Sequence, residues 1–162
     1  MDLPDAADFR IIGKLSVRSS DSSAAGRFIW VQSAERYELE IWGPFGQGRR
    51  RLQGDEQTVR LLDGGGQLLL QGPVAQVMRA QLGWELPLGS LRHWVQGRPD
   101  PARRLANIDQ NSNGRAQKID QESWQISYPE YFEPAEYGGK PRRLIARGEG
   151  YEIRLAISRW EV

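Results

Sequence analysis

Apolar and polar residues alternate along the first third of the chain with a period of two, which is typical of β-strands. In the segment 9–17, odd positions such as Ile11 and Leu15 are apolar. Even positions such as Arg10 and Lys14 are charged. This pattern predicts a strand with one face in a core and the other in solvent.

Turn residues divide the rest of the chain into further short strands. Pairs such as Gly54-Asp55 and Asn113-Gly114 suit the tight connections of antiparallel neighbours. The segment 129–141 holds three prolines and is expected to be a loop. The predicted strands are 9–17, 26–32, 37–41, 48–53, 58–62, 67–71, 103–109, 115–120, 124–128, 142–147 and 151–160.

The period changes to that of a helix between residues 73 and 97. Pro73 can occupy the first position of one helix, and Gly83 can end it. Pro87 can start a second helix, which Gly97 can end. Because the apolar residues here recur at helical spacing, we expect a helical insert that covers or fills part of the sheet.

Together these segments predict one mainly β domain over residues 1–162, with about eleven strands and two or more short helices. Short, uniform turns favour a single curled antiparallel sheet, either open or closed into a barrel. The helices would then cover its opening. A β-sandwich is the alternative architecture.

Composition narrows the functional classes. The chain has 22 basic and 21 acidic residues, so its net charge of +1 provides no general attraction to nucleic acid. It contains no cysteine, which excludes a disulfide framework and thiolate chemistry. No run of residues approaches the roughly 18 apolar positions of a transmembrane helix.

Candidate catalytic groups are few. The single histidine, His93, lies beside Trp94 and is more typical of a structural residue than of a catalytic one. The glycines 64–66 lie between two predicted strands, so they lack the strand-to-helix context of a phosphate-binding loop. Glu38 and Glu40 share the solvated face of a strand. The sequence therefore favours a protein without enzymatic activity, metal or cofactor.

The turn 42–48 is unusual because Phe45 stands where hairpin tips normally carry polar side chains. Phe45 could fold back onto the sheet or project toward an apolar partner, and the residues alone leave both readings open. The basic run 49–51 follows directly. It could form a solvated edge strand or contact anionic lipid headgroups.

Several motifs, in their order and spacing, resemble the LolB family of outer-membrane lipoproteins over about residues 9–160. The motifs include Phe28-Ile29-Trp30-Val31-Gln32, Gly43-Pro44-Phe45-Gly46, Leu82-Gly83-Trp84-x-Leu86-Pro87, Leu91-x-x-Trp94-Val95-x-Gly97 and Gln121-x-x-Trp124-x-Ile126-x-Tyr128. The resemblance implies an open, incompletely closed antiparallel β-barrel of about eleven strands. Its helices would cover an apolar cavity.

The resemblance also implies a function. A member of this family accepts lipoproteins from a LolA-like periplasmic carrier, binds their acyl chains in the cavity and inserts them into the inner leaflet of the outer membrane. Phe45, between Pro44 and Gly46, stands at the position of the hydrophobic loop tip implicated in insertion. We expect a monomer without nucleic-acid partners.

The acyl-chain cavity is expected to be lined by inward positions of the strands and helices. Two alternatives are a lipid carrier without membrane-insertion activity and a solid interaction domain in which Phe45 binds a protein. The predicted lining residues are Ile11, Leu15, Phe28, Trp30, Tyr37, Leu39, Ile41, Leu82, Trp84, Leu91, Trp94, Ile126, Tyr128, Leu144, Ile153 and Leu155.

The start of the chain departs from the family pattern. Family members carry an export signal and a lipid-modified cysteine, whereas Met1 is followed here by the short polar segment 2–8. We expect Met1 to stand in their place, and the native form to be lipid-anchored at the periplasmic face of the outer membrane.

Overall fold

One antiparallel sheet runs through almost the whole chain in the computed structural model, which describes residues 8–43, 48–82 and 85–161. The strands lie in the order β6-β5-β4-β3-β2-β1-β11-β10-β9-β8-β7. Their bounds are β1 Asp8–Arg18, β2 Ser23–Ser33, β3 Arg36–Trp42, β4 Arg50–Gly54, β5 Thr58–Asp63, β6 Leu68–Pro73, β7 Leu105–Gln110, β8 Ala116–Gln121, β9 Trp124–Tyr131, β10 Pro141–Gly148 and β11 Tyr151–Glu161.

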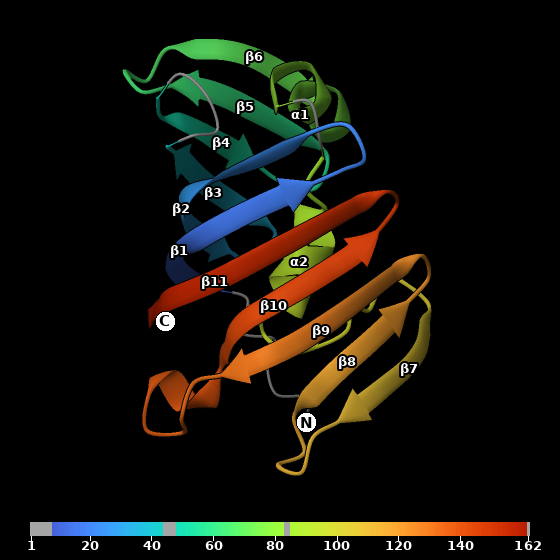
Figure 1. Cartoon of the computed structure of the whole chain (residues 1–162). Helices are drawn as coiled ribbons and strands as arrows, with labels where there is room; N and C mark the ends of the chain where they lie inside the picture. The colour runs from blue at the N-terminus through green and yellow to red at the C-terminus, as the bar shows by residue number, and fades with distance from the viewer. Residues whose placement is uncertain (1–7, 44–47, 83–84, 162) are drawn as a thin grey trace.

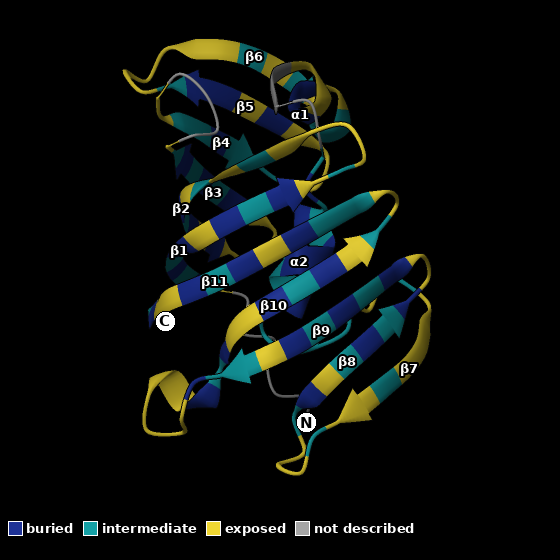
Figure 2. Cartoon of the chain, in the orientation of Figure 1, coloured by how far each residue is buried: buried dark blue, intermediate teal, exposed yellow. Residues whose placement is uncertain are grey.

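The sheet curls but does not close. Its end strands β6 and β7 lie at opposite ends of the molecule (Figure 1) and pair only with β5 and β8, respectively. This confirms the predicted mainly β fold with an open, barrel-like sheet of eleven strands. Both end strands are largely exposed (Figure 2).

Side-chain alternation places one apolar face of this sheet inside. Ile11 pairs with Trp30 on one side and Trp160 on the other, and all three are buried. Leu15 likewise pairs with Leu155, which pairs with Leu144. Because neighbouring strands keep this register, the inward rows join into one continuous core.

A β-bulge at Gly13 helps the centre of the sheet to bend. The pairing of β1 with β11 shifts between Ile12 and Gly13. A Cβ atom at Gly13 would collide with the carbonyl oxygen of Ala156. Only glycine therefore allows β11 to approach β1 so closely at this position.

Two sequence predictions about strands were wrong. The expected loop 129–141 is shorter, because β9 continues to Tyr131, which pairs with Pro141 at the start of β10. The pairing is irregular beside Pro129, which has no N–H group to contribute. The basic run 49–51 does not form an edge strand, since β4 lies between β3 and β5.

Two helices connect the halves of the sheet, as predicted. Helix α1 (Val74–Leu82) follows β6 directly, and α2 (Leu88–Trp94) begins after Pro87. A short 3₁₀ helix, η1 (Tyr137–Gly139), lies between β9 and β10. Helix α2 ends earlier than expected, and the N–H of Gly97 closes the following turn by donating to the Trp94 carbonyl. None of the described helices is long and apolar enough to cross a bilayer.

Candidate functional site

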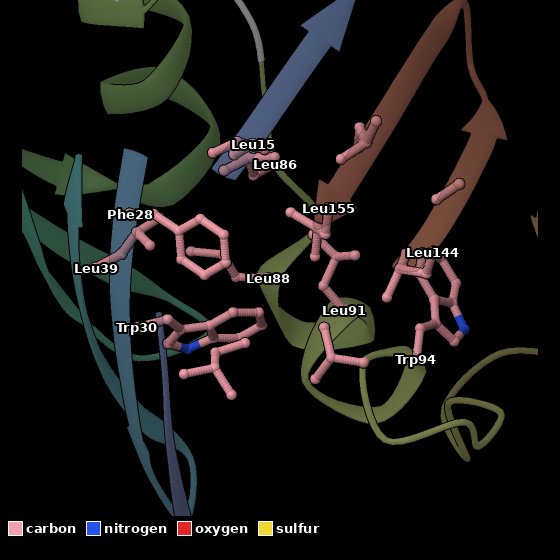
Figure 3. Close-up of a cluster of buried hydrophobic side chains, with 14 of the residues drawn as sticks. Leu15, Phe28, Trp30, Leu39, Leu86, Leu88, Leu91, Trp94, Leu144 and Leu155 are labelled. Atoms are coloured by element: carbon pink, nitrogen blue, oxygen red, sulfur yellow. The ribbon is translucent and has the colours of Figure 1, made fainter. Parts of the chain in front are cut away.

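The helical insert faces the inner surface of the sheet and completes its core. Leu86, Leu88 and Leu91 lie between side chains of strands from both halves of the chain (Figure 3). Phe28 and Leu39 approach them from one half. The apolar interior is therefore shared by the two halves, with α2 between them.

Every described member of the predicted cavity lining belongs to this cluster and is at most 7% exposed. Contact with a bound ligand stays a prediction for each of them. The Leu82 side chain and Trp84 lie outside the described residues. The described members are Ile11, Leu15, Phe28, Trp30, Tyr37, Leu39, Ile41, Leu91, Trp94, Ile126, Tyr128, Leu144, Ile153 and Leu155.

Side chains themselves fill the interior around these residues. Ile11, Trp94 and Ile126 are 0% exposed, which leaves no space for water beside their side chains. A ligand inside this cluster would have to displace side chains or move a helix. The structure therefore represents a closed state of the apolar interior, in which side chains occupy the place that a ligand would take.

A groove of about 980 Å³ runs along the rim of the sheet beside the helices. On the helical side it is lined by Leu86 and Leu88, and on the opposite rim by Trp124 and Tyr151. Arg79, Glu85, Arg92 and Glu149 are among its charged lining residues. The groove therefore places a mixed polar and apolar surface directly over the apolar interior.

Gln121, at the end of β8, attaches α2 to the C-terminal half of the sheet. Its side-chain oxygen accepts hydrogen bonds from the Trp94 Nε1–H at 2.8 Å and from the Asp100 N–H at 2.7 Å. Its amide group donates to the carbonyls of Asp100 and Arg103. Because Gln121 is fully buried, all four bonds form without competition from water.

Asp100 extends this attachment. The Ser90 hydroxyl donates to Asp100 Oδ2 at 2.6 Å and accepts from Arg103 Nε at 2.7 Å. His93 is buried beside them, with Nε2 3.9 Å from Asp100 Oδ1. This buried position suits a structural role for His93, which is the role that the sequence favoured.

Sequence reasoning named Gln121 only as part of a motif, without predicting its role, and it missed Asp100. The signal for Gln121 was present, because residue 121 continues the inward alternation of Ile119 and places an amide in an apolar row. Asp100 lies in an irregular segment, where no periodicity predicts burial.

On the N-terminal side, Arg92 of α2 reaches the turns between β2 and β3 and between β4 and β5. Its guanidinium donates to the Ala34 carbonyl at 2.9 Å and to Glu56 at 3.1 Å. Glu56 is half exposed, so this ion pair is worth less than the buried bonds of Gln121. The hydrogen bonds of α2 with β8 and β9 are therefore more buried than the Arg92 contacts with the N-terminal half.

Two interior tyrosines differ in their surroundings. Tyr128 donates its hydroxyl hydrogen bond to the Trp94 carbonyl at 2.6 Å, and burial raises its pKa well above the usual value. Burial also raises the pKa of Tyr37, with a further contribution from Asp55. The Tyr37 hydroxyl has no hydrogen-bond partner among the described residues.

The predicted loop tip, Pro44, Phe45 and Gly46, lies outside the described residues. Its flanking strands are well ordered: Ile41 of β3 pairs with Arg50 of β4. Arg49 forms an ion pair with Glu40 at 2.8 Å, and Arg51 forms one with Glu38 at 3.3 Å. Glu38 and Glu40 therefore serve as cross-strand partners on the outer face.

Among the described residues, no group of three or more His, Cys, Asp or Glu side chains is placed to hold a metal ion.

The family model described as "Outer membrane lipoprotein LolB" matches residues 7–160 of the chain. The chain is 34% identical to the outer-membrane lipoprotein LolB of Stutzerimonas stutzeri, over 94% of this chain and 73% of that protein. It is 33% identical to the protein of the same name from Pseudomonas aeruginosa PAO1, over 94% and 74%, respectively. None of these names describes an enzyme.

Solved structures share the fold. A LolA superfamily protein from Nitrosomonas europaea superimposes with a TM-score of 0.59 at 13% identity, over 99% of this chain and 87% of that one. A DUF1329 family protein from Desulfovibrio piger has a TM-score of 0.52 at 7% identity, over 96% and 85%. At these identities the likeness concerns the fold alone.

Proposed function

The chain belongs to the LolB family of outer-membrane lipoproteins, and on that premise we propose that it accepts lipoproteins from a LolA-like periplasmic carrier and inserts them into the outer membrane. In this role the protein binds the acyl chains of its cargo, acts without catalysis and releases the cargo into the inner leaflet. The native protein is held at that membrane by its own lipid anchor.

The observation that carries this proposal is the apolar interior between the sheet and the helical insert. Its walls come from both halves of an unclosed sheet, and its cover includes Leu86, Leu88 and Leu91. An acyl chain that replaces these contacts gains about 0.8 kcal/mol for each buried methylene group. Partial burial is enough for binding and still allows release to a membrane.

The unequal attachment of α2 indicates how the interior opens. The Gln121 network keeps α2 on the C-terminal half, whereas Arg92 forms two partly exposed contacts with the N-terminal half, with Ala34 and Glu56. Separation on the Arg92 side would widen the rim groove, because Arg92, Leu86 and Leu88 all line it. The acyl chains would then enter between α2 and strands β2–β5.

Release is assigned to the segment 44–47, with Phe45 at its tip. A single phenylalanine that enters a membrane contributes about 1.5–3 kcal/mol, which supports transient contact rather than anchoring. The paired strands β3 and β4 fix both ends of this segment.

The deciding experiment is a two-step transfer. A labelled lipoprotein bound to its LolA-like carrier is mixed with this protein, and the loaded complex is then added to liposomes. We expect the label to move first to this protein and then to the liposomes. Loading without release would instead favour a lipid carrier, and failure to load would contradict the proposal.

A binding assay tests the interior directly. A fluorescent acyl probe should bind saturably and be displaced by a lipoprotein. The same lipoprotein without its acyl chains is the matched control and should not displace the probe. Displacement by both forms would place recognition on the protein part of the cargo and contradict acyl binding.

A further inference from the structure

A second groove, of about 830 Å³, crosses the outer face of the sheet. The helices lie on the other face (Figure 1). It extends over the six neighbouring strands β3, β2, β1, β11, β10 and β9. The outward-facing residues that line it are Lys14, Ser16, Ala25, Arg27, Trp42, Pro129, Arg143, Ile145, Arg154 and Ala156.

The floor of this outer groove is apolar. Trp42, Ile145 and Ala156 are only partly buried there, on the face that the alternation of the strands leaves to solvent. Pro129 adds a further apolar surface at one end. In the strand register Arg27 and Lys14 lie between Trp42 and Ala156, so these apolar residues are interleaved with basic ones.

Four cations are interleaved with these apolar residues. Lys14, Arg27, Arg143 and Arg154 line the outer groove, and none of its described lining residues is acidic. Arg143 and Arg154 form ion pairs with the partly exposed Glu130 and Glu152. Lys14 and Arg27 have no ion-pair partner among the described residues, so their charges are available to an anion.

We propose that the outer groove binds an anionic phospholipid, with the phosphate among these four cations and part of one acyl chain on the floor of Trp42, Ile145 and Ala156. Basic side chains interleaved with apolar ones are complementary to a ligand that has an anionic head and an alkyl chain.

An acidic peptide segment fits this groove less well. Strands β1, β2, β10 and β11 are each paired on both sides, so they have no free edge to which a peptide strand could add. A peptide backbone on the apolar floor would leave its own N–H and C=O groups without partners. An acyl chain has no such groups.

The outer groove goes beyond the proposed cargo site, since it lies on the opposite face of the sheet. Gly43, which leads into the segment of Phe45, also lines it. A phospholipid bound here would hold the protein with that segment close to the membrane surface.

The test uses the protein without cargo and vesicles of phosphatidylglycerol and phosphatidylcholine in equal parts. We expect the double variant K14E/R27E to bind these vesicles roughly tenfold or more weakly than the unmodified protein. The double variant R60E/R104E is the matched control, because it makes the same change in net charge at exposed basic residues outside the groove. It should retain binding.

Bromine-labelled acyl chains give a second readout that does not depend on the charge variants. Vesicles with brominated lipid should quench tryptophan fluorescence, and W42F should reduce that quenching. Equal loss of binding in both double variants, or quenching unchanged by W42F, would overturn the proposal. So would a K14E/R27E protein that binds vesicles normally but no longer binds an acidic protein partner. Failure of cargo transfer alone would leave these results unaffected.

Discussion

The hydroxyl groups of Tyr37 and Tyr128 show how strongly a buried polar atom depends on its partner. Tyr37 loses water without gaining a hydrogen bond to any of the described residues, whereas Tyr128 donates one to the last carbonyl of α2, that of Trp94. An unpaired buried hydroxyl destabilises the folded state, and a paired one stabilises it modestly.

We therefore expect Tyr37→Phe to leave the free energy of unfolding unchanged or to raise it by up to about 1 kcal/mol. Tyr128→Phe is the matched control and should lower it by about 1–2 kcal/mol, because the bond to Trp94 is lost. Denaturant unfolding of both variants measures the difference. A larger loss for Tyr37→Phe than for Tyr128→Phe would contradict this account.

Buried tyrosines also predict a loss of stability in alkali. Burial raises the pKa of Tyr131 to about 12, although Arg115 partly opposes the shift, and burial raises the pKa of Tyr128 well above the usual value. Below about pH 10 the phenols are neutral in both folded and unfolded chains. Above it only the unfolded chain ionises, so stability should fall between about pH 10 and pH 12.

The midpoint of denaturant unfolding, measured from pH 8 to pH 12, checks this expectation. Tyr131→Phe should flatten the fall, because it removes one of the groups that ionise. Lys140 has the opposite effect on the pH dependence of stability, because burial, with Arg98 nearby, lowers its pKa. A midpoint that stays constant to pH 12 would show that the tyrosines do not control alkaline unfolding.

At the scale of an element, α2 has one strong and one weak attachment. Gln121→Leu removes four hydrogen bonds, three of them buried, and should cost about 2–4 kcal/mol of stability. Gln125→Leu is the control, because Gln125 is only partly buried and makes one 3.3 Å bond to Asp120. Thermal or denaturant unfolding distinguishes them, and equal effects would refute a special role for Gln121.

Arg92→Ala tests the weak attachment. Because the contacts of Arg92 with Ala34 and Glu56 are partly exposed, their loss should cost about 1 kcal/mol or less. It should nevertheless speed the loading of an acyl probe, since α2 separates from the N-terminal half more easily. Loading at the unmodified rate would show that the interior opens elsewhere.

The elements differ in how far the sequence could predict them. Strand positions followed from alternation, because a strand with one buried face must place apolar residues at every second position. The bulge at Gly13 and the pairing beside Pro129 depend on how closely two strands approach, which no local pattern encodes. The same holds for the Gln121 network, whose partners are 18 to 27 residues away.

The sequence could predict the residues of the candidate site only as a group, without showing which of them contact a ligand. Inward apolar positions identified the interior residues, and the structure places the described ones in a single cluster. Alternation could not distinguish a solid core from a cavity, since both bury the same face. That distinction depends on whether α2 moves.

On the scale of the whole molecule, binding and release place opposite demands on the interior. Full burial of every acyl chain, at about 0.8 kcal/mol for each methylene group, would trap the cargo. The closed, side-chain-filled interior reduces the net gain, because cargo must replace contacts such as those of Leu88 and Leu91. Weak net binding thus favours onward transfer to a membrane.

Phe45→Glu separates the two demands. Loading uses the interior, so the variant should accept a lipoprotein from the carrier at the unmodified rate. Release should fall about tenfold to a hundredfold, because a charged tip forfeits the roughly 1.5–3 kcal/mol that phenylalanine gains in the membrane. Leu105→Glu, an exposed apolar position on the end strand β7, is the control and should release normally. If Phe45→Glu releases cargo as fast as Leu105→Glu does, the membrane contact does not depend on Phe45.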